Sequence, residues 1–482
     1  MRWFLVGAVV LAALLGPGRL PGTAAAGEGD APAKLEAEDP EVAAARAAVE
    51  KARQAVPAGE EAKRDGGRLL RLALLDVARA LEDLVSMLRS RKLPFDDEAL
   101  QLRLVYLELR SSLQGSAGSG PSGGPTGGST LRAAAERGLD WLARHQGTSA
   151  DEGAWDADGF GGKCQGKKCE GPGGPLFDPA LTGLALLAFL EAGETPSTPK
   201  YGIAVAGGLK HLKGIQDGEG CFGPRRSNHF TYNHGIAALA MAKAFRATAS
   251  PLFEKSARAG ASFALACQNP NLAWRYGVRP EDNDTSVTGW MVSALASARD
   301  AGIEVDPFAF DGALAWLDRV SEPEYGRVGY TARGNGPARP QQLMDAFPAD
   351  QSESLTAEGV HIRLRCGQAK DHEMVRKGMA LVGKCLPRWD LKAGCIDLYY
   401  WYFGTLVSAE AANDAAWSRW RASLESALLP VQRGEKSGCA RGSWDPLDPW
   451  VYEGGRVYST AMATLALLVA DRRDSAPGMR PK

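Results

Sequence analysis

The sequence predicts an all-α protein whose main part is a closed ring of six helical hairpins. Two observations favour this fold. From residue 131 onward, amphipathic helical segments alternate with more apolar ones, and a small residue recurs in each apolar segment at the equivalent position. These small residues are Gly183, Gly235, Gly289, Gly359, Gly404 and Ala461. A helix that is apolar all round must be surrounded, so the apolar helices form an inner ring and the amphipathic helices an outer one.

Length and charge narrow the classes of protein that the chain can belong to. Its 482 residues exceed the roughly 250 to 300 residues of one ordinary hydrophobic core, which favours two domains or one large closed architecture. The hydrophobic fraction of 45% is that of a globular protein. A net charge of -1 lacks the basic footprint of a nucleic-acid binder, so we expect no nucleic acid as a partner.

The first 26 residues have the pattern of a signal peptide. Arg2 is followed by an apolar run over 4–15 and by the small residues 24–26, and this order is typical of an export signal. We therefore expect an exported protein, periplasmic or extracellular, cleaved near Ala26. The alternative is an uncleaved anchor, which the run disfavours because it is shorter than the roughly 20 residues of a spanning helix. No later segment is long and apolar enough, so we expect no stable transmembrane span.

The next segment, 27–114, is rich in Ala, Leu, Glu and Arg. Leucines and a valine between Leu70 and Leu88 alternate in steps of four and three, and a second leucine face follows Pro94. This spacing predicts a helical hairpin. Residues 115–130 are almost entirely Gly, Ser, Pro and Thr, which predicts a linker. The ring is then expected over 131–472, with a tail over 473–482.

The cysteines suggest disulfide bonds. All 8 lie after residue 160, and in an exported chain an even number is compatible with pairing. We expect one disulfide between Cys164 and Cys169, which share a Gly-rich loop, and one between Cys385 and Cys395, which flank a Pro-containing turn. Cys366 lies in an apolar helical stretch and is expected to be a buried thiol. The pairing of the other cysteines is left open.

One motif carries a resemblance to a known superfamily. Arg137-Gly138-x2-Trp141-Leu142-x3-Gln146, followed by Gly153-x-Trp155, resembles the QW motif of squalene cyclases and protein prenyltransferases. Five further units look like degenerate copies, so the resemblance covers residues 131 to 472 and implies the α/α toroid of that superfamily. The whole pattern looks most like the exported prenyltransferase/squalene-oxidase repeat proteins of bacteria. The motif is structural and implies no particular chemistry.

The chemical signatures of the superfamily are incomplete here. The run Glu281 to Ser286 resembles the acid motif of class II terpene cyclases, but Asn283 stands where the proton-donating Asp belongs. The resemblance to prenyltransferases would place zinc ligands at Cys395-Ile396-Asp397, in reversed order, and in the run 458–460, where Ser459 replaces the His. We therefore expect no bound metal and no cofactor. Asp397 is also explained as a helix N-cap.

The N-termini of the inner helices should meet at one end of the ring. Their unpaired N–H groups create positive potential, which favours an anionic or hydroxyl-rich ligand. The residues expected to bind it are Tyr232, His234, Asp284, Asp397, Tyr399 and Tyr458, and the catalytic candidates among them are Asp284, Asp397, His234 and Tyr458. A simple capping role for Asp284 stays open.

Three functions agree with this reading, and they leave open whether the protein is an enzyme. The favoured one is an exported toroid that binds a ligand or acts as a scaffold; its partner is an unknown small molecule, glycan or protein. The first alternative is a carbohydrate-active lyase or hydrolase that uses the carboxylate, Tyr and His groups. The second is a terpenoid cyclase or a prenyltransferase-like enzyme.

Overall fold

The computed structural model describes residues 129–147, 153–227, 229–340 and 343–475, with isolated positions at 43, 44, 46–48, 51, 54 and 80. Contacts divide the chain into two units, Met1–Ser122 and Gly123–Lys482, and the division falls within the expected linker 115–130. The expected signal peptide 1–26, most of the segment 27–114 and nearly all of the linker lie outside the described residues. Those boundaries therefore stay predictions.

The helices of the second unit form two concentric layers. The outer layer consists of α5 (Thr130–Arg144), α7 (Gly202–Gly214), α9 (Pro251–Cys267), α11 (Phe308–Val320), α13 (Glu373–Val382) and α15 (Asp414–Leu428). The inner layer consists of α6 (Asp178–Glu191), α8 (Phe230–Thr248), α10 (Thr285–Asp300), α12 (Ser354–Arg365), α14 (Leu398–Ala411) and α16 (Val451–Ser475). Short 3-10 helices lie in the connections, among them η2 (Phe160–Lys163), η3 (Pro175–Phe177), η5 (Ala349–Gln351) and η6 (Glu435–Ala440).

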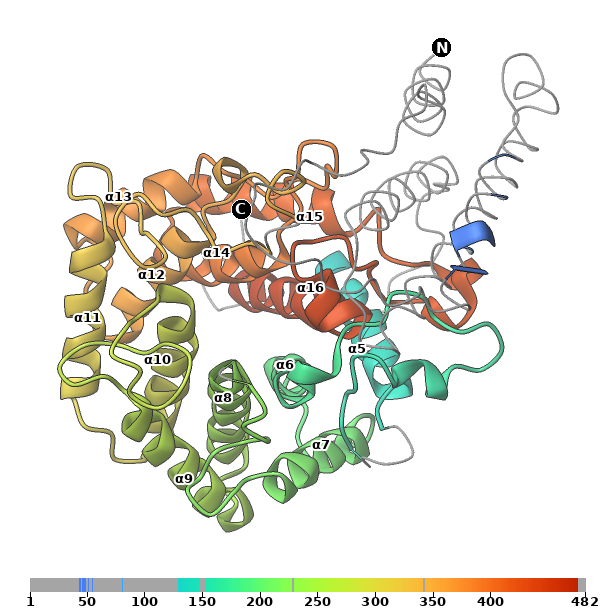
Figure 1. Ribbon diagram of the computed structural model, residues 1–482, viewed down its shortest axis with the longest axis horizontal. Coiled ribbons are helices and arrows are strands. Elements are labelled where there is room, and N and C mark those ends of the chain that lie inside the picture. The colour runs from blue at the N-terminus through green and yellow to red at the C-terminus, as the bar shows by residue number, and fades with distance from the viewer. Residues whose placement is uncertain are drawn as a thin grey trace, which may run out of the picture. The chain divides into compact units, whose positions relative to one another are not determined.

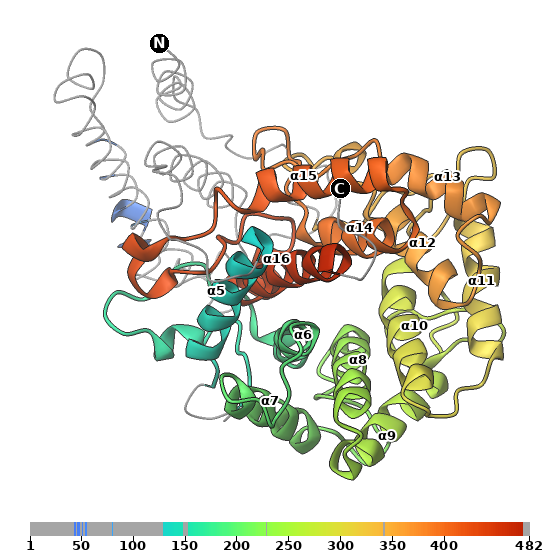
Figure 2. The same cartoon turned by 180° about the vertical axis from the view of Figure 1, so that it is seen from behind.

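The inner helices close into a ring. Each packs against the next, and the last one, α16, packs against both α6 and α5 (Figures 1 and 2). Within the described residues, strand-like pairing is limited to isolated bridges such as that between Gln216 and Phe222. The predicted fold, an all-α toroid of six hairpins, is confirmed.

The two layers differ in burial as their sequences predict. In α6 every residue from Pro179 to Phe189 is buried, whereas α5 buries one face, which includes Leu139 and Trp141. Such a one-sided helix can face water while its apolar stripe covers the inner ring. Among the described residues, no helix combines the length and the hydropathy needed to cross a bilayer.

A glutamine at the end of an outer helix links each of four hairpins to its neighbour. Gln146 Nε2 donates to Gly153 O in its own turn at 2.9 Å and to Ala204 O of α7 at 2.8 Å. Gln216, Gln268 and Gln432 make the same pair of bonds. Because Gln432 donates to Ala134 O of α5 at 2.8 Å, this repeated contact also joins the sixth hairpin to the first.

The glycine-aromatic turns fasten the outer helix to the inner one. Trp155 Nε1 donates to Leu142 O at 2.8 Å, and its backbone N donates to Thr182 Oγ1 at 3.0 Å. Trp274 and Trp444 make the equivalent bonds. Gly153 has a φ of +98°, and a Cβ there would lie 2.2 Å from Gly207 O. Only glycine fits this position, because it tolerates both the dihedral angle and the close approach.

Candidate functional site

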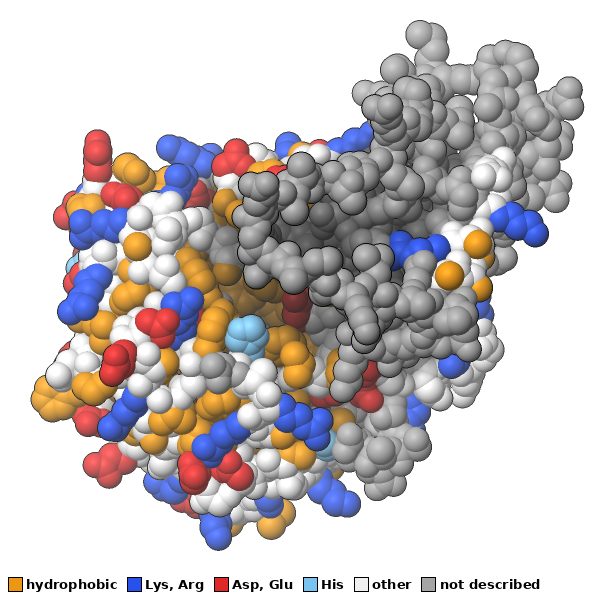
Figure 3. Space-filling model, in the orientation of Figure 1, with side chains coloured by type: hydrophobic (Ala, Val, Ile, Leu, Met, Phe, Trp, Pro, Cys, Tyr) orange, Lys and Arg blue, Asp and Glu red, His pale blue; other side chains and the backbone are white. Residues whose placement is uncertain are grey.

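The N-termini of the inner helices lie at one end of the ring, which we call the mouth. Hydrogen bonds join these starts to one another or to the segments that precede the neighbouring inner helix: Ala180 N to Asn233 Oδ1, Thr285 N to Tyr330 O, Ser352 Oγ to Asp397 Oδ2 and Arg456 N to Gly171 O. The middle of the described face is hollowed, with hydrophobic, histidine and acidic side chains around the hollow (Figure 3). Six helix N-termini at one place give the mouth a positive potential.

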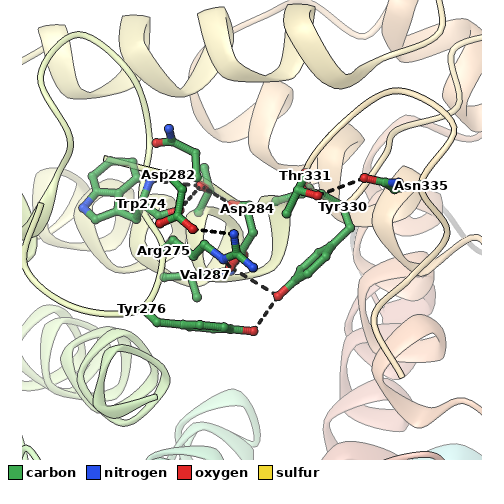
Figure 4. A network of polar contacts seen from close by, with 12 residues as sticks. Trp274, Arg275, Tyr276, Asp282, Asp284, Val287, Tyr330, Thr331 and Asn335 are labelled. Carbon is green, nitrogen blue, oxygen red and sulfur yellow. Dashed lines mark hydrogen bonds and ion pairs between the residues drawn. The ribbon is translucent and has the colours of Figure 1, made fainter. Parts of the chain in front are cut away.

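Asp284 lies at the centre of a polar network in the mouth (Figure 4). Its Oδ1 accepts from Val287 N at 2.7 Å, which caps α10. Its Oδ2 accepts from Tyr330 OH at 3.3 Å and lies 3.7 Å from Arg275 Nε. Arg275 also donates to Asp282 Oδ2 at 2.5 Å, so its positive charge is shared between two carboxylates. The capping role expected for Asp284 is present, together with further polar contacts.

Burial changes the acid strength of Asp284. The side chain is fully buried, and this desolvation raises the pKa of Asp284 to about 7. The Val287 N–H, Arg275 and Tyr330 stabilise the carboxylate and act in the opposite direction, but they do not outweigh the loss of water. Asp284 can therefore hold and release a proton near neutral pH.

Phenol groups surround Asp284. The hydroxyls of Tyr276 and Tyr330 are 2.5 Å apart, and the Tyr276 ring lies edge-on to His229 at 4.4 Å and tilted against Tyr232 at 6.0 Å. Burial raises the pKa of Tyr276 and of Tyr330, so both remain hydrogen-bond donors. The phenols come from segments that precede inner helices, and they provide donors beside an acid.

A second buried acid, Glu358, belongs to the inner helix α12. Its Oε1 accepts from Tyr399 OH of α14 at 2.7 Å, and the Tyr399 hydroxyl is 2.8 Å from Ser286 Oγ of α10. A Cβ on Gly289 would lie 2.0 Å from Oε1, so glycine is required for this packing. Glu358 thus contacts the inner helices on both sides of its own, which places its side chain inside the ring. Burial raises the pKa of Glu358 well above its usual value.

Asp397 is compensated more fully than the other acids. Its Oδ1 accepts from Tyr400 N at 2.9 Å and caps α14. Its Oδ2 accepts from Arg339 Nη2 at 2.6 Å and from Ser352 Oγ at 2.8 Å. Arg339 and Asp397 form a buried ion pair, with 4% and 2% of their side chains exposed. These contacts assign Asp397 a capping and ion-pairing role.

Asp448 and Tyr458 lie next to this ion pair. Asp448 Oδ1 accepts from Trp450 N at 3.0 Å, and burial, with a smaller effect of Asp397, raises the pKa of Asp448 to about 8. Electrostatic interactions connect Tyr458 with Asp448 and with Tyr399. Glu358 Oε2, Asp448 Oδ2 and Tyr458 OH have no hydrogen-bond partner among the described residues.

Aromatic side chains fill the ring deeper than the mouth. Trp290 of α10 stacks on Tyr402 of α14 at 6.2 Å between ring centroids and meets Phe403 edge-on at 5.3 Å. His361 of α12 packs edge-on against Phe403 at 5.5 Å. These four side chains are buried and fill the inside of the toroid at this level.

His234, a predicted site residue, does not reach the mouth. Its Nε2 donates to Gly260 O of α9 at 3.1 Å and its Nδ1 accepts from Phe222 N at 3.3 Å, so its two nitrogens join the turn of the second hairpin to the outer helix of the third. It occupies the place that Thr182 and Thr288 have in other hairpins. The other five predicted residues, Tyr232, Asp284, Asp397, Tyr399 and Tyr458, lie at or within two turns of inner-helix starts.

Several polar groups of the mouth were missed by sequence reasoning: Arg275, Tyr276, Tyr330, Arg339 and Asp448. All come from irregular segments between an outer and an inner helix, where no periodicity shows which side chains meet. A partial signal existed. Tyr330 belongs to a glycine-aromatic turn, and Tyr276 follows Trp274 of another by two residues.

The predicted disulfides are wrong. All 8 cysteines lie within the described residues, and all are free thiols. Cys385 Sγ donates to Gln351 O at 3.5 Å, and Cys395 Sγ to Gln351 Oε1 at 3.3 Å, so the two thiols bind one glutamine instead of each other. Cys164 and Cys169 lie in a different cluster, with His145 and Cys439.

The place where the prenyltransferase resemblance would put zinc does not fit that ion. Asp397 is already paired with Arg339, and a neighbouring guanidinium repels a cation. Ser459 stands at the imidazole's position, and zinc in proteins takes three or four protein ligands.

The chain was compared with known proteins. No protein-family model matches it, and no curated protein does. Among solved structures, it is similar to a type II terpene cyclase from Scytonema, with 14% identity, a TM-score of 0.46 and coverage of 71% of this chain and 97% of that one. It is also similar to a novel alpha-amylase from Clostridium perfringens, with 12% identity, a TM-score of 0.46 and coverage of 70% of this chain and 97% of that one. A protein from Actinoplanes has 16% identity and a TM-score of 0.43, with coverage of 72% of this chain and 100% of that one. At these scores the similarity says nothing about the chemistry of this chain.

Proposed function

We propose that the protein is a ligand-binding toroid whose mouth takes a hydroxyl-rich ligand. The observation that carries this proposal is that three buried oxygen atoms, Glu358 Oε2, Asp448 Oδ2 and Tyr458 OH, have no hydrogen-bond partner among the described residues. An unsatisfied buried polar group costs about 1–3 kcal/mol. A ligand that supplies hydroxyl groups at these positions would recover that free energy, and each hydroxyl can both donate and accept.

The protonation states of the mouth favour a neutral or anionic ligand over a cation. Burial raises the pKa of Asp284 to about 7 and that of Asp448 to about 8, and it raises the pKa of Glu358 as well. Asp448 is therefore mostly protonated at neutral pH and Asp284 about half protonated, and both lose their remaining negative charge as the pH falls below 7. Arg275 lies beside Asp284, and the helix N-termini add positive potential. Sugars and uronates have the oxygen-rich chemistry that such a site recognises.

The binding test uses two mouth variants and one matched control. We would titrate a panel of neutral oligosaccharides and uronates into wild type, Glu358→Gln and Tyr458→Phe by calorimetry. The control is Tyr201→Phe, because Tyr201 donates its hydroxyl to Asp140 of α5 at 2.7 Å, away from the mouth. A mouth ligand should lose at least about tenfold in affinity, or about 1.4 kcal/mol, in both mouth variants and nothing in the control. If a glycan bound both mouth variants with the same affinity as wild type, binding at the mouth would be contradicted.

Acid catalysis is a second candidate, and Asp284 favours it. A carboxyl with a pKa of about 7 is suited to proton transfer near neutral pH, and the hydroxyl of Tyr330 is 3.3 Å from its Oδ2. This arrangement supports the carbohydrate-active lyase or hydrolase. It supports the terpenoid cyclase less, because Asn283, at the position of that family's acid, is engaged by Asn269 and by Ala273 N at 3.0 Å each.

Product formation separates catalysis from binding. Wild type and Asp284→Asn would be incubated with any glycan that binds, and the mixtures analysed by mass spectrometry. Asn caps a helix about as well as Asp but cannot donate a carboxyl proton. Catalysis predicts products with wild type and none with Asp284→Asn. Unchanged glycan with wild type would leave binding as the function.

A further inference from the structure

Three thiols and one imidazole meet where the ring closes. His145 follows the last residue of α5, Cys164 and Cys169 lie in the loop after η2, and Cys439 belongs to η6. His145 Nε2 lies 3.5 Å from Cys164 Sγ, 3.5 Å from Cys169 Sγ and 3.3 Å from Cys439 Sγ. The four atoms all lie within 4.8 Å of one another. The residues come from the first and the sixth hairpin.

Hydrogen bonding alone does not explain this convergence. His145 Nδ1 is 2.8 Å from Trp141 O, and a carbonyl oxygen only accepts, so Nδ1 carries the proton. Nε2 therefore has one lone pair and no hydrogen. One lone pair can accept from one thiol, yet three sulfur atoms lie around it. A cation at the centre of the four atoms would satisfy all of them together.

The distances match a tetrahedral zinc site. With Zn–S bonds of about 2.3 Å and a Zn–N bond of about 2.0 Å, the edges of a tetrahedron between nitrogen and sulfur are about 3.5 Å long. The three N···S distances are 3.5, 3.5 and 3.3 Å. A disulfide, by contrast, needs two sulfur atoms about 2.05 Å apart, and it would leave the third thiol and the imidazole without a role.

The surroundings orient the four groups as metal ligands. The bond from His145 Nδ1 to Trp141 O fixes the ring tautomer, as the outer neighbours of metal-bound histidines do. The His145 ring also stacks on Trp141 at 4.2 Å. Cys169 N donates to Cys164 Sγ at 3.2 Å, which stabilises sulfur as a thiolate. Arg456 Nε donates to Glu170 O at 2.7 Å and so holds the loop beside Cys169.

We propose that His145, Cys164, Cys169 and Cys439 bind one structural Zn²⁺ ion that fastens the first hairpin to the sixth. On binding, the three thiols release three protons, and the complex of Zn²⁺, three thiolates and neutral imidazole carries one negative charge. Arg144 and Arg456 are within electrostatic reach of Cys169 and compensate that charge. Four protein ligands leave no open position, so the ion is structural and takes no part in the chemistry of the mouth.

A zinc ion at this place would stabilise the closed form of the ring. His145 and Cys439 are 294 positions apart in the sequence, and the connection between them is the ring itself. A crosslink that closes a long loop restricts the unfolded chain strongly. At the same seam, Gln432 donates to Ala134 O, and Arg144 Nη2 donates to Arg441 O at 2.8 Å. The ion would add its binding free energy to these weaker contacts.

The test measures metal content and its effect on the full-length chain. We would purify wild type, Cys439→Ser and, as a matched thiol control, Cys366→Ser under reducing conditions. The zinc content of each would be measured by inductively coupled plasma mass spectrometry. Cys366 is a half-buried thiol that lies outside the cluster. Wild type and Cys366→Ser should hold one equivalent, and Cys439→Ser should bind zinc at least about tenfold more weakly. A chelator should lower the melting temperature of wild type and of Cys366→Ser.

Cobalt gives a second readout that does not depend on the stability of a variant. Co²⁺ added to chelator-treated wild type should produce the visible absorption of tetrahedral thiolate-bound cobalt. Zinc-free wild type that gains no zinc when the ion is supplied would overturn the proposal. The proposal would also be overturned if protein that was first reduced, then supplied with zinc and then exposed to air showed a disulfide between Cys164 and Cys169 in a peptide map.

Discussion

Asp284 and Asp397 hold the same place in two hairpins and differ in how their charge is compensated. Each is buried, each caps an inner helix, and each receives the N–H of the residue three positions on. Asp397 has a buried guanidinium at 2.6 Å and a hydroxyl at 2.8 Å. Asp284 has a phenol at 3.3 Å and an arginine at 3.7 Å that also serves Asp282.

This difference in charge compensation distinguishes Asp397, an acid with a structural role, from Asp284, an acid suited to proton transfer or ligand binding. A buried carboxylate with a close cation and a full set of hydrogen bonds holds its neighbours in place. A buried carboxyl without close compensation avoids the charge by keeping its proton, as the pKa of about 7 for Asp284 indicates. One capping position therefore produces two kinds of acid, and the residues brought in by the preceding loops decide which kind.

The largest effect should come from removing the partner of Asp397. Arg339→Met leaves a buried, uncompensated carboxylate, and we expect a loss of about 3–5 kcal/mol in the free energy of unfolding. The matched variant Arg275→Met should cost about 1 kcal/mol or less, because Arg275 is 26% exposed and pairs with an exposed Asp282. Urea unfolding measures both. Equal losses would contradict the distinction between the two acids.

The next effect is a pH dependence that belongs to Asp284. Its pKa is raised from 3.8 to about 7 in the folded protein, so the folded state holds this proton more tightly than the unfolded state does. The free energy of unfolding should therefore fall as pH rises from about 4 to about 7 and stay at the lower level above that. At about 1.4 kcal/mol per pKa unit, the loss is on the order of 4 kcal/mol.

Asp284→Asn isolates that contribution, because Asn keeps the cap and cannot ionise. Relative to wild type, this variant should gain stability between about pH 4 and about pH 8. Free energies of unfolding of both proteins, measured at about pH 4 and about pH 8, give the change in their stability difference. Asp397→Asn is the control, and it should lose stability at both pH values because it leaves Arg339 unpaired. A constant difference between Asp284→Asn and wild type would mean that Asp284 is not the group that titrates.

A smaller effect should follow from removing one phenol. Tyr330→Phe deletes a hydrogen bond that stabilises the Asp284 carboxylate, so the pKa of Asp284 should rise further. The fall in stability with pH should then be centred at a higher pH, with a cost of about 1 kcal/mol for the lost bond. Tyr201→Phe, in the outer layer, should leave the pH profile of Asp284 unchanged. A shift to lower pH would show that Tyr330 does not donate to Asp284.

Much of the fold could be predicted because its causes repeat. The outer-helix glutamines and the glycine-aromatic turns recur at similar places in the sequence, and each performs the same bonding. Asp284 and Asp397 could be predicted as caps for the same reason, since their side chains precede apolar helices. Local rules of this kind need no knowledge of distant residues.

The site was predicted less completely because its partners come from elsewhere in the chain. Arg339 is 58 positions from Asp397, and Tyr330 is 46 from Asp284; both lie in segments without periodicity. His234 was predicted in the mouth because of its imidazole, without regard to its position in the repeat. An alignment with Thr182 and Thr288 would have shown its structural role. Pairing Cys164 with Cys169 relied on nearness in sequence and missed Cys439.

The central claim is that burial raises the pKa of Asp284, Glu358 and Asp448 enough for protonated carboxyl groups to be present in the mouth near neutral pH, where they can bond a ligand. Infrared difference spectroscopy tests it directly, because protonated carboxyl groups absorb apart from carboxylates. At neutral pH we predict a protonated-carboxyl band in wild type that weakens in Glu358→Gln and in Asp284→Asn, and that shifts when a mouth ligand is added. A wild-type spectrum without any protonated-carboxyl absorption at neutral pH would contradict the account.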